Sequence, residues 1–104
     1  IIQANGHSME PRIMDGDFCV FRANIVGSRI GKIVLVQHPE HYDFENGGSY
    51  SIKKYSSEKK QDPETGEWMH ERIILYPLNP DYQPIEIRNE EGFIVVGEFI
   101  GIVK

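Results

Sequence analysis

The chain has 104 residues, which suits one domain, so we expect a single domain over residues 1–104. Its content of 39% hydrophobic and 26% charged residues is typical of a globular protein and excludes a disordered one. The formal net charge of −5 argues against direct DNA binding by this domain, because phosphate contacts need clustered lysine and arginine.

The single cysteine, Cys19, excludes an internal disulfide framework and a zinc site made of several cysteines. It falls inside a predicted strand, where we interpret it as a buried, inert thiol. No apolar stretch reaches the ~18 residues of a membrane-spanning helix, so we expect no membrane association and a cytoplasmic location. We also expect the chain, which begins at Ile1 without a methionine or a signal peptide, to be a piece of a longer protein.

Five segments with strand-forming residues predict strands, in chain order at 17–22, 32–37, 49–55, 71–76 and 93–103. Turn signals separate them, and the signal at 62–66 predicts a hairpin between Tyr55 and Trp68. In the last segment, Gly97 and Gly101 predict bends or bulges. The pattern predicts a compact, mostly β fold with coiled sheets and little or no helix, apart from at most one helical turn after Ser8.

Two polar motifs are weak candidates for chemistry. His38 and His41 have a spacing that metal ligands can use, but Pro39 prevents a regular helix and no third ligand is fixed by spacing. A polar loop is the favoured interpretation there, and we expect no metal site. Ser56 and Lys59 match a Ser-x-x-Lys motif, but its partner motifs are missing, so we interpret this stretch as an exposed loop.

Ser8 lies between a glycine-containing turn and a proline, and an Asp15-Gly16-Asp17 turn follows. Two interpretations stay open: a side chain that caps a short turn, or a nucleophile. A nucleophile needs a base, and the histidines are poor candidates. His7 is the sequence neighbour of Ser8, so their side chains diverge, and the other three histidines stand in polar surroundings without an evident aspartate partner.

A lysine is the alternative base, as in Ser–Lys variants of the catalytic triad. A free lysine has a pKa near ~10.4, so a catalytic lysine must be desolvated to be neutral at ordinary pH. Lys53 and Lys54, between Ile52 and Tyr55, are the pair of lysines in an apolar strand. Because side chains alternate along a strand, one of the two can face Ser8, and the sequence alone leaves open which one.

Four blocks of the chain, in the right order, resemble LexA-type self-cleaving repressors, to which the type I signal peptidases are distantly related. The blocks are Gly6-His-Ser-Met9 with Ile13-Met-Asp-Gly-Asp17, then Ser51-Ile-Lys-Lys-Tyr55, Leu78-Asn-Pro-Asp-Tyr-Gln-Pro-Ile85 and Val96-Gly-Glu-Phe-Ile-Gly-Ile-Val103. The third block favours the LexA branch, because a signal peptidase would also bring a membrane anchor.

The resemblance implies a barrel-like β fold of the LexA and signal peptidase type and a serine endopeptidase without a cofactor. Ser8 is then the nucleophile, and Lys53 is the general base, because the family's base directly follows the apolar residue. Gly6 and Met9 would give backbone support to the oxyanion. The substrate would be the protein's own N-terminal segment, in a stress-responsive (SOS-type) or phage-type transcriptional repressor.

The resemblance also implies a homodimer and a RecA–DNA filament as activator. The long apolar profile of residues 93–103 predicts an exposed edge strand through which the dimer forms. The family cuts an Ala-Gly or Cys-Gly bond, and this chain contains neither, so we expect the cleavage site to lie outside it.

The connections at 37–48 and 56–68 are longer than usual and could hold partner contacts. Two alternatives stay open. One is a non-catalytic dimerisation or regulatory module of a repressor or of a larger nucleic-acid enzyme. The other is a processing peptidase similar to signal peptidases.

Overall fold

The strand-forming segments build a fold of strands alone. The computed structural model describes residues 1–37, 50–87 and 92–103, and every regular element within these ranges is a strand. The strands are β1 (Ile2–Gln3), β2 (Phe18–Arg22), β3 (Ile33–Gln37), β4 (Tyr50–Gln61), β5 (Trp68–Tyr76), β6 (Ile85–Ile87) and β7 (Ile94–Val103). The prediction of a mostly β fold is confirmed. None of the described residues belong to a helix with the length and hydrophobicity needed to cross a membrane.

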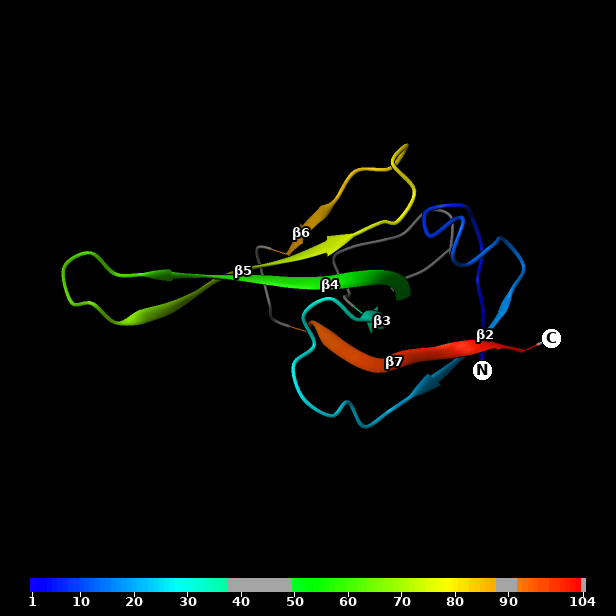
Figure 1. The fold of residues 1–104 in the computed structure, drawn as a ribbon, viewed down its shortest axis with the longest axis horizontal. Helices are drawn as coiled ribbons and strands as arrows, with labels where there is room; N and C mark the ends of the chain where they lie inside the picture. The colour runs from blue at the N-terminus through cyan, green and yellow to red at the C-terminus, as the bar shows by residue number, and fades with distance from the viewer. Residues whose placement is uncertain (38–49, 88–91, 104) are drawn as a thin grey trace.

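The seven strands form one antiparallel sheet in the order β1-β2-β7-β3-β4-β5-β6, which curls into a half-barrel (Figure 1). The far halves of β4 and β5 extend from this body as a long hairpin, drawn at the left of Figure 1. Its turn is closed by a hydrogen bond from the Asp62 amide to the Glu67 carbonyl at 2.7 Å, which confirms the predicted hairpin. The interpretation of Ser56 to Lys59 as a loop is wrong, because these residues pair with β5 in the hairpin.

β7 is an interior strand of the sheet. β2 pairs with its residues from Glu98 to Val103, and β3 pairs with its residues from Ile94 to Glu98 on the other side. The prediction that residues 93–103 form an edge strand is therefore wrong. The strand is long and apolar because it crosses the middle of the sheet between two partners.

Two bulges interrupt β7 beside its glycines, as predicted. The register with β3 shifts so that Val96, next to Gly97, has no paired residue. The register with β2 shifts in the same way at Ile100, next to Gly101. These irregularities bend the strand and increase its twist, which helps the sheet to curl.

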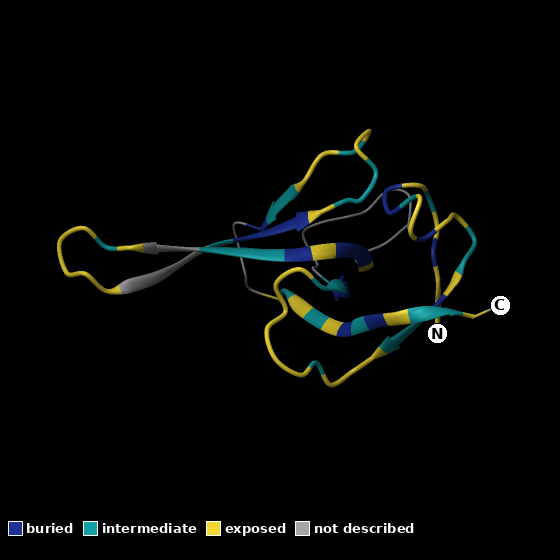
Figure 2. Cartoon of the chain, viewed as in Figure 1, coloured by how far each residue is buried: buried dark blue, intermediate teal, exposed yellow. Residues whose placement is uncertain are grey.

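Two hydrophobic cores lie on opposite faces of the sheet, because side chains alternate along each strand. In β3, Leu35 belongs to the first core, whereas Val34 and Val36 belong to the second. The other buried members of the first core are Ala4, Met9, Ile13, Cys19, Ile52 and Phe99. Figure 2 shows buried residues concentrated in the body and exposed residues at the far end of the hairpin.

Cys19 in β2 has no exposed surface, so its prediction as a buried thiol is confirmed. Burial, and to a lesser degree the negative charge of Asp17, raises the pKa of the Cys19 thiol above its ordinary value. The thiolate is the reactive form of cysteine, so a raised pKa keeps this side chain inert.

Candidate functional site

Ser8 lies in a tight loop that joins β1 to β2. Gly6 adopts φ of +99°, a left-handed conformation that glycine takes without steric cost, so the chain can turn sharply before Ser8. The Gly6 amide donates a hydrogen bond to Asp15 Oδ1 at 2.7 Å, and the Gly16 amide donates to the Ala4 carbonyl at 2.8 Å. The Asp15-Gly16-Asp17 turn thus holds this loop in place through its hydrogen bonds.

A hydrogen-bonded turn follows Ser8. The carbonyl of Met9 accepts hydrogen bonds from the amides of Arg12 and Ile13, both at 3.0 Å. The side chains of Met9 and Ile13 are buried in the first core, where they anchor the two ends of the turn. Ser8 is therefore attached to packed structure immediately on its C-terminal side.

The side chains of Ser8 and Lys53 meet inside the protein. Lys53 Nζ lies 3.1 Å from Ser8 Oγ, although 45 residues separate them in sequence. Ser8 is 8% exposed and Lys53 is 3% exposed, whereas the neighbouring Lys54 is exposed to solvent. Alternation along β4 accounts for this difference, because Ser51, Lys53 and Tyr55 share one face and are all buried.

The Lys53 amine has further polar neighbours in β4. Its Nζ lies 2.9 Å from Ser51 Oγ and 3.2 Å from the carbonyl oxygen of Ile52. A neutral amine has two N–H donors and one lone pair. It can therefore donate to Ser51 and Ile52 while its lone pair accepts the hydroxyl proton of Ser8. This arrangement can activate a serine as a nucleophile without a histidine.

Sequence reasoning did not assign a role to Ser51 or to Asn79. The contact of Ser51 with Lys53 could have been predicted, because a residue two positions before Lys53 lies on the same face of a strand. Asn79 comes after β5 and contacts the Ser8 loop through two hydrogen bonds. Its side-chain Nδ2 donates to the His7 carbonyl at 2.9 Å, and its backbone amide donates to the Ser8 carbonyl at 3.0 Å. No local pattern around Asn79 indicates this contact.

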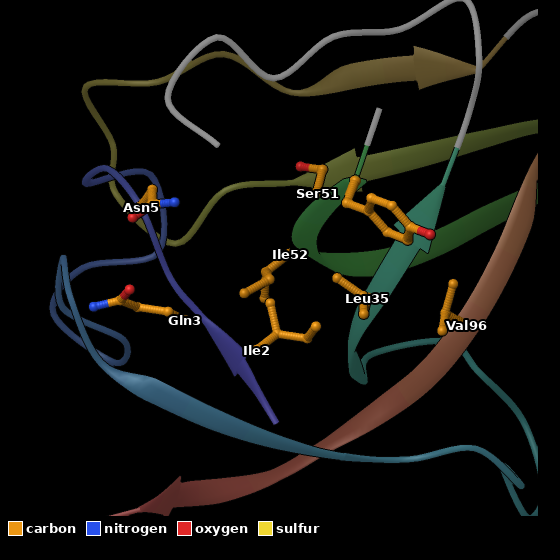
Figure 3. Close-up of a pocket in the computed structure, with 8 residues that line it drawn as sticks. Ile2, Gln3, Asn5, Leu35, Ser51, Ile52 and Val96 are labelled. Carbon is orange, nitrogen blue, oxygen red and sulfur yellow. The ribbon is translucent and has the colours of Figure 1, made fainter. Parts of the chain in front are cut away.

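A cavity of about 400 Å³ is lined in part by Ser51 and Ile52, the two residues that precede Lys53 (Figure 3). Its lining is mostly apolar and comes from β1, β3, β4, β7 and the loop after β1, with Ile2, Gln3, Asn5, Leu35, Tyr50, Ser51, Ile52 and Val96 around it. Asn5 and Ile52 also line a small hollow that contains Ser8. A chain bound in the larger cavity could therefore continue to the serine.

One strand edge next to this cavity is open among the described residues. β1 is the terminal strand of the sheet and pairs with β2 on one side. Open strand edges offer backbone donors and acceptors to an extended peptide.

The histidine pair that the sequence offered as metal ligands, His38 and His41, lies outside the described residues. Within residues 1–37, 50–87 and 92–103, no group of three histidine, cysteine, aspartate or glutamate side chains is placed to share a metal ion. His7 Nδ1 contacts Glu10 Oε2 at 2.8 Å, in an exposed pair next to Ser8.

Comparison with known proteins gives a partial similarity. No protein-family model matches the chain. LexA repressors of Xylella fastidiosa strains M12, M23 and Temecula1 are each 41% identical to it over 34 residues, which are 33% of this chain. The match spans 16% of the length of those repressors. It supports a relation to LexA-type repressors over that stretch.

Proposed function

We propose that the chain is a serine endopeptidase domain with a Ser–Lys dyad, which cleaves a segment of the longer protein to which it belongs. The observation that supports this most is the 3.1 Å separation of Ser8 Oγ and Lys53 Nζ at a buried position. The partial similarity to LexA repressors agrees with a repressor as the parent protein.

The reaction begins when the neutral amine of Lys53 accepts the hydroxyl proton of Ser8. Ser8 Oγ attacks the carbonyl carbon of the scissile peptide bond, and an oxyanion forms. The C–N bond then breaks, and Lys53 returns its proton to the leaving amine. Water attacks the resulting ester, again with Lys53 as the base, and releases Ser8 and the new carboxyl terminus.

The oxyanion needs hydrogen-bond donors that are already in place. Backbone amides at and next to Ser8, including that of Met9, are the proposed donors. The amide of Gly6 is bonded to Asp15, so the contribution of Gly6 is the sharp turn that presents these amides. Burial of the Met9 side chain at 4% exposure holds the backbone of this segment in position.

The substrate is an extended segment of the parent protein. The apolar cavity beside the dyad would bind its side chains, and the open edge of β1 would bind its backbone. A segment outside the present chain fits this role, since the chain itself contains no Ala-Gly or Cys-Gly bond of the family type.

A second copy of the chain and a RecA–DNA filament remain the proposed partners. Edge pairing through β7 no longer supports the dimer. Exposed apolar side chains on the paired strands β2 and β7 support it instead, namely Phe18 at 50%, Ile100 at 54% and Val103 at 48% exposure. Contiguous exposed apolar residues of this kind are typical of protein contacts.

The proposal is tested by following fragments of the full-length protein over time, with a Ser8→Ala variant as the control. Wild type should yield two fragments and the variant none. If the wild type stays intact, the dyad is idle and the domain is a regulatory or dimerisation module.

A further inference from the structure

Asn79 forms the centre of a hydrogen-bond network between the Ser8 loop and the chain after β5. Its Nδ2 donates to the His7 carbonyl at 2.9 Å, and its backbone amide donates to the Ser8 carbonyl at 3.0 Å. Its Oδ1 accepts from the Asp81 amide at 2.9 Å, and its carbonyl accepts from the Tyr82 amide at 3.1 Å. The two oxygen atoms of Asn79 thus accept hydrogen bonds within its own turn. Its two N–H groups hold the consecutive carbonyls of His7 and Ser8.

The positions of these two carbonyls determine where two amide hydrogens point. The peptide bonds from His7 to Ser8 and from Ser8 to Met9 are trans. In a trans peptide unit, the C=O and N–H bonds point in nearly opposite directions. Because Asn79 holds the carbonyls of His7 and Ser8 on its own side, the amide hydrogens of Ser8 and Met9 point away from it.

We propose that the side chain of Asn79 is a positioning residue that orients the Ser8 amide as an oxyanion donor. This inference rests on the proposed peptidase function. Asn79 itself touches no reacting atom; it acts through the His7 carbonyl. Preorganised donors at an oxyanion contribute about 10²–10³-fold to the rate in other enzymes, and misorientation forfeits part of this.

The side-chain contribution can be separated from the other bonds. The hydrogen bond from the Asn79 backbone amide to Ser8 survives any substitution of the side chain except proline. The His7 carbonyl also accepts from the Glu10 amide, at the longer distance of 3.2 Å, so the loop retains a weaker restraint. Substitution should therefore loosen the Ser8 amide without unfolding the loop.

Asn79→Asp is the sharpest variant. Its carboxylate keeps an acceptor for the Asp81 amide but loses the donor to His7 and sets an oxygen against the His7 carbonyl. We expect the plateau rate of self-cleavage in the full-length protein to fall about 10- to 100-fold. In Asn79→Ala, which adds no charge beside the Ser8 loop, the pH at which the rate reaches half of its plateau should stay unchanged. Asn24→Asp makes the same chemical change at an exposed position and should cleave at the wild-type rate.

A second measurement does not need activity. In ¹⁵N-labelled protein, the Ser8 amide nitrogen senses hydrogen bonding at the carbonyl of the same peptide unit. Its resonance should shift in Asn79→Asp and in Asn79→Ala, while resonances of buried core residues such as Val34 and Leu75 stay in place. Thermal unfolding of each variant confirms that it is folded.

The outcomes separate the two proposals. If wild type cleaves and Asn79→Asp cleaves equally fast, the positioning role is overturned and the peptidase function stands. A changed pH midpoint in Asn79→Ala would show that the substitution acts on the dyad itself, and it would also overturn the positioning role. If wild type cleaves nothing, the peptidase proposal fails, and the Ser8 resonance decides whether Asn79 orients this amide: a shift supports it and an unchanged position refutes it.

Discussion

Lys53 and Lys54 are sequence neighbours in β4, yet Lys53 is 3% exposed and lies against Ser8 whereas Lys54 is exposed to solvent. Side chains alternate along a β-strand, so the two lysines point to opposite faces. Substitution of Lys53 therefore tests the dyad, and substitution of Lys54 is the matched control.

Lys53→Ala should abolish self-cleavage, because it removes the base. Lys53→Arg should be equally inactive at every accessible pH, because arginine stays protonated. Lys54→Ala should cleave within about twofold of wild type, since exposed side chains contribute little. Fragment yield from the full-length protein measures all three. An active Lys53→Ala with an inactive Lys54→Ala would contradict the placement of the two side chains.

Ser51→Ala removes an acceptor that lies 2.9 Å from Lys53 Nζ. The amine then loses an orienting hydrogen bond, which is worth about 1 kcal/mol, so we expect cleavage to slow by roughly fivefold. Ser57→Ala is the matched control, a serine on the same face of β4 six positions further along. Equal rates for the two variants would show that Ser51 does not position the lysine.

Gly97→Ala should destabilise the fold. A Cβ at this position would lie 2.9 Å from the backbone carbonyl oxygen of Arg22, so β2 or β7 must shift. Overpacking of this kind costs about 1–3 kcal/mol. Gly101→Ala is the control in the same strand, because a Cβ there has no neighbour within 4 Å. Thermal unfolding should show a clear drop in Tm for Gly97→Ala and little change for Gly101→Ala; the reverse order would contradict the described register of β7.

The Cys19 thiol should make stability depend on pH in alkaline solution. Burial raises the pKa of Cys19, so the folded protein keeps the thiol proton to a higher pH than the unfolded chain does. The stabilisation is complete below the ordinary thiol pKa and is lost as the pH rises through the folded value. Tm should therefore fall more steeply in wild type than in Cys19→Ala once the pH exceeds the ordinary thiol pKa. Parallel pH curves for the two proteins would contradict this.

The sequence predicted the elements whose periodicity is strong. β2, β3 and β7 are rich in β-branched and aromatic residues, and each lies within two residues of its expected bounds. β1 and β6, with two and three residues, are too short to show a period. The outer half of β4 was missed because its hairpin is polar, so no apolar alternation marks it.

The sequence pattern could not predict which strands pair or which distant segments come into contact. A long apolar strand has the same composition at an edge and in the interior, so β7 could not be placed without its neighbours. For the site, the apolar strand setting narrowed the base to Lys53 or Lys54, and the family resemblance selected Lys53. The contact of Asn79 with the Ser8 loop joins segments about 70 residues apart, and only folding brings them together.

The central claim is that Ser8 and Lys53 form a working dyad. The most direct test is to incubate the purified full-length protein from neutral to alkaline pH, together with Ser8→Ala, and to identify fragments by gel and mass spectrometry. Both proteins should have the same Tm, because the change removes a single hydroxyl. The account predicts two fragments from wild type, at a rate that rises with pH and then levels off as the lysine becomes neutral, and none from Ser8→Ala. Cleavage of Ser8→Ala at the wild-type rate, or a folded wild type that stays intact at every pH, would contradict it.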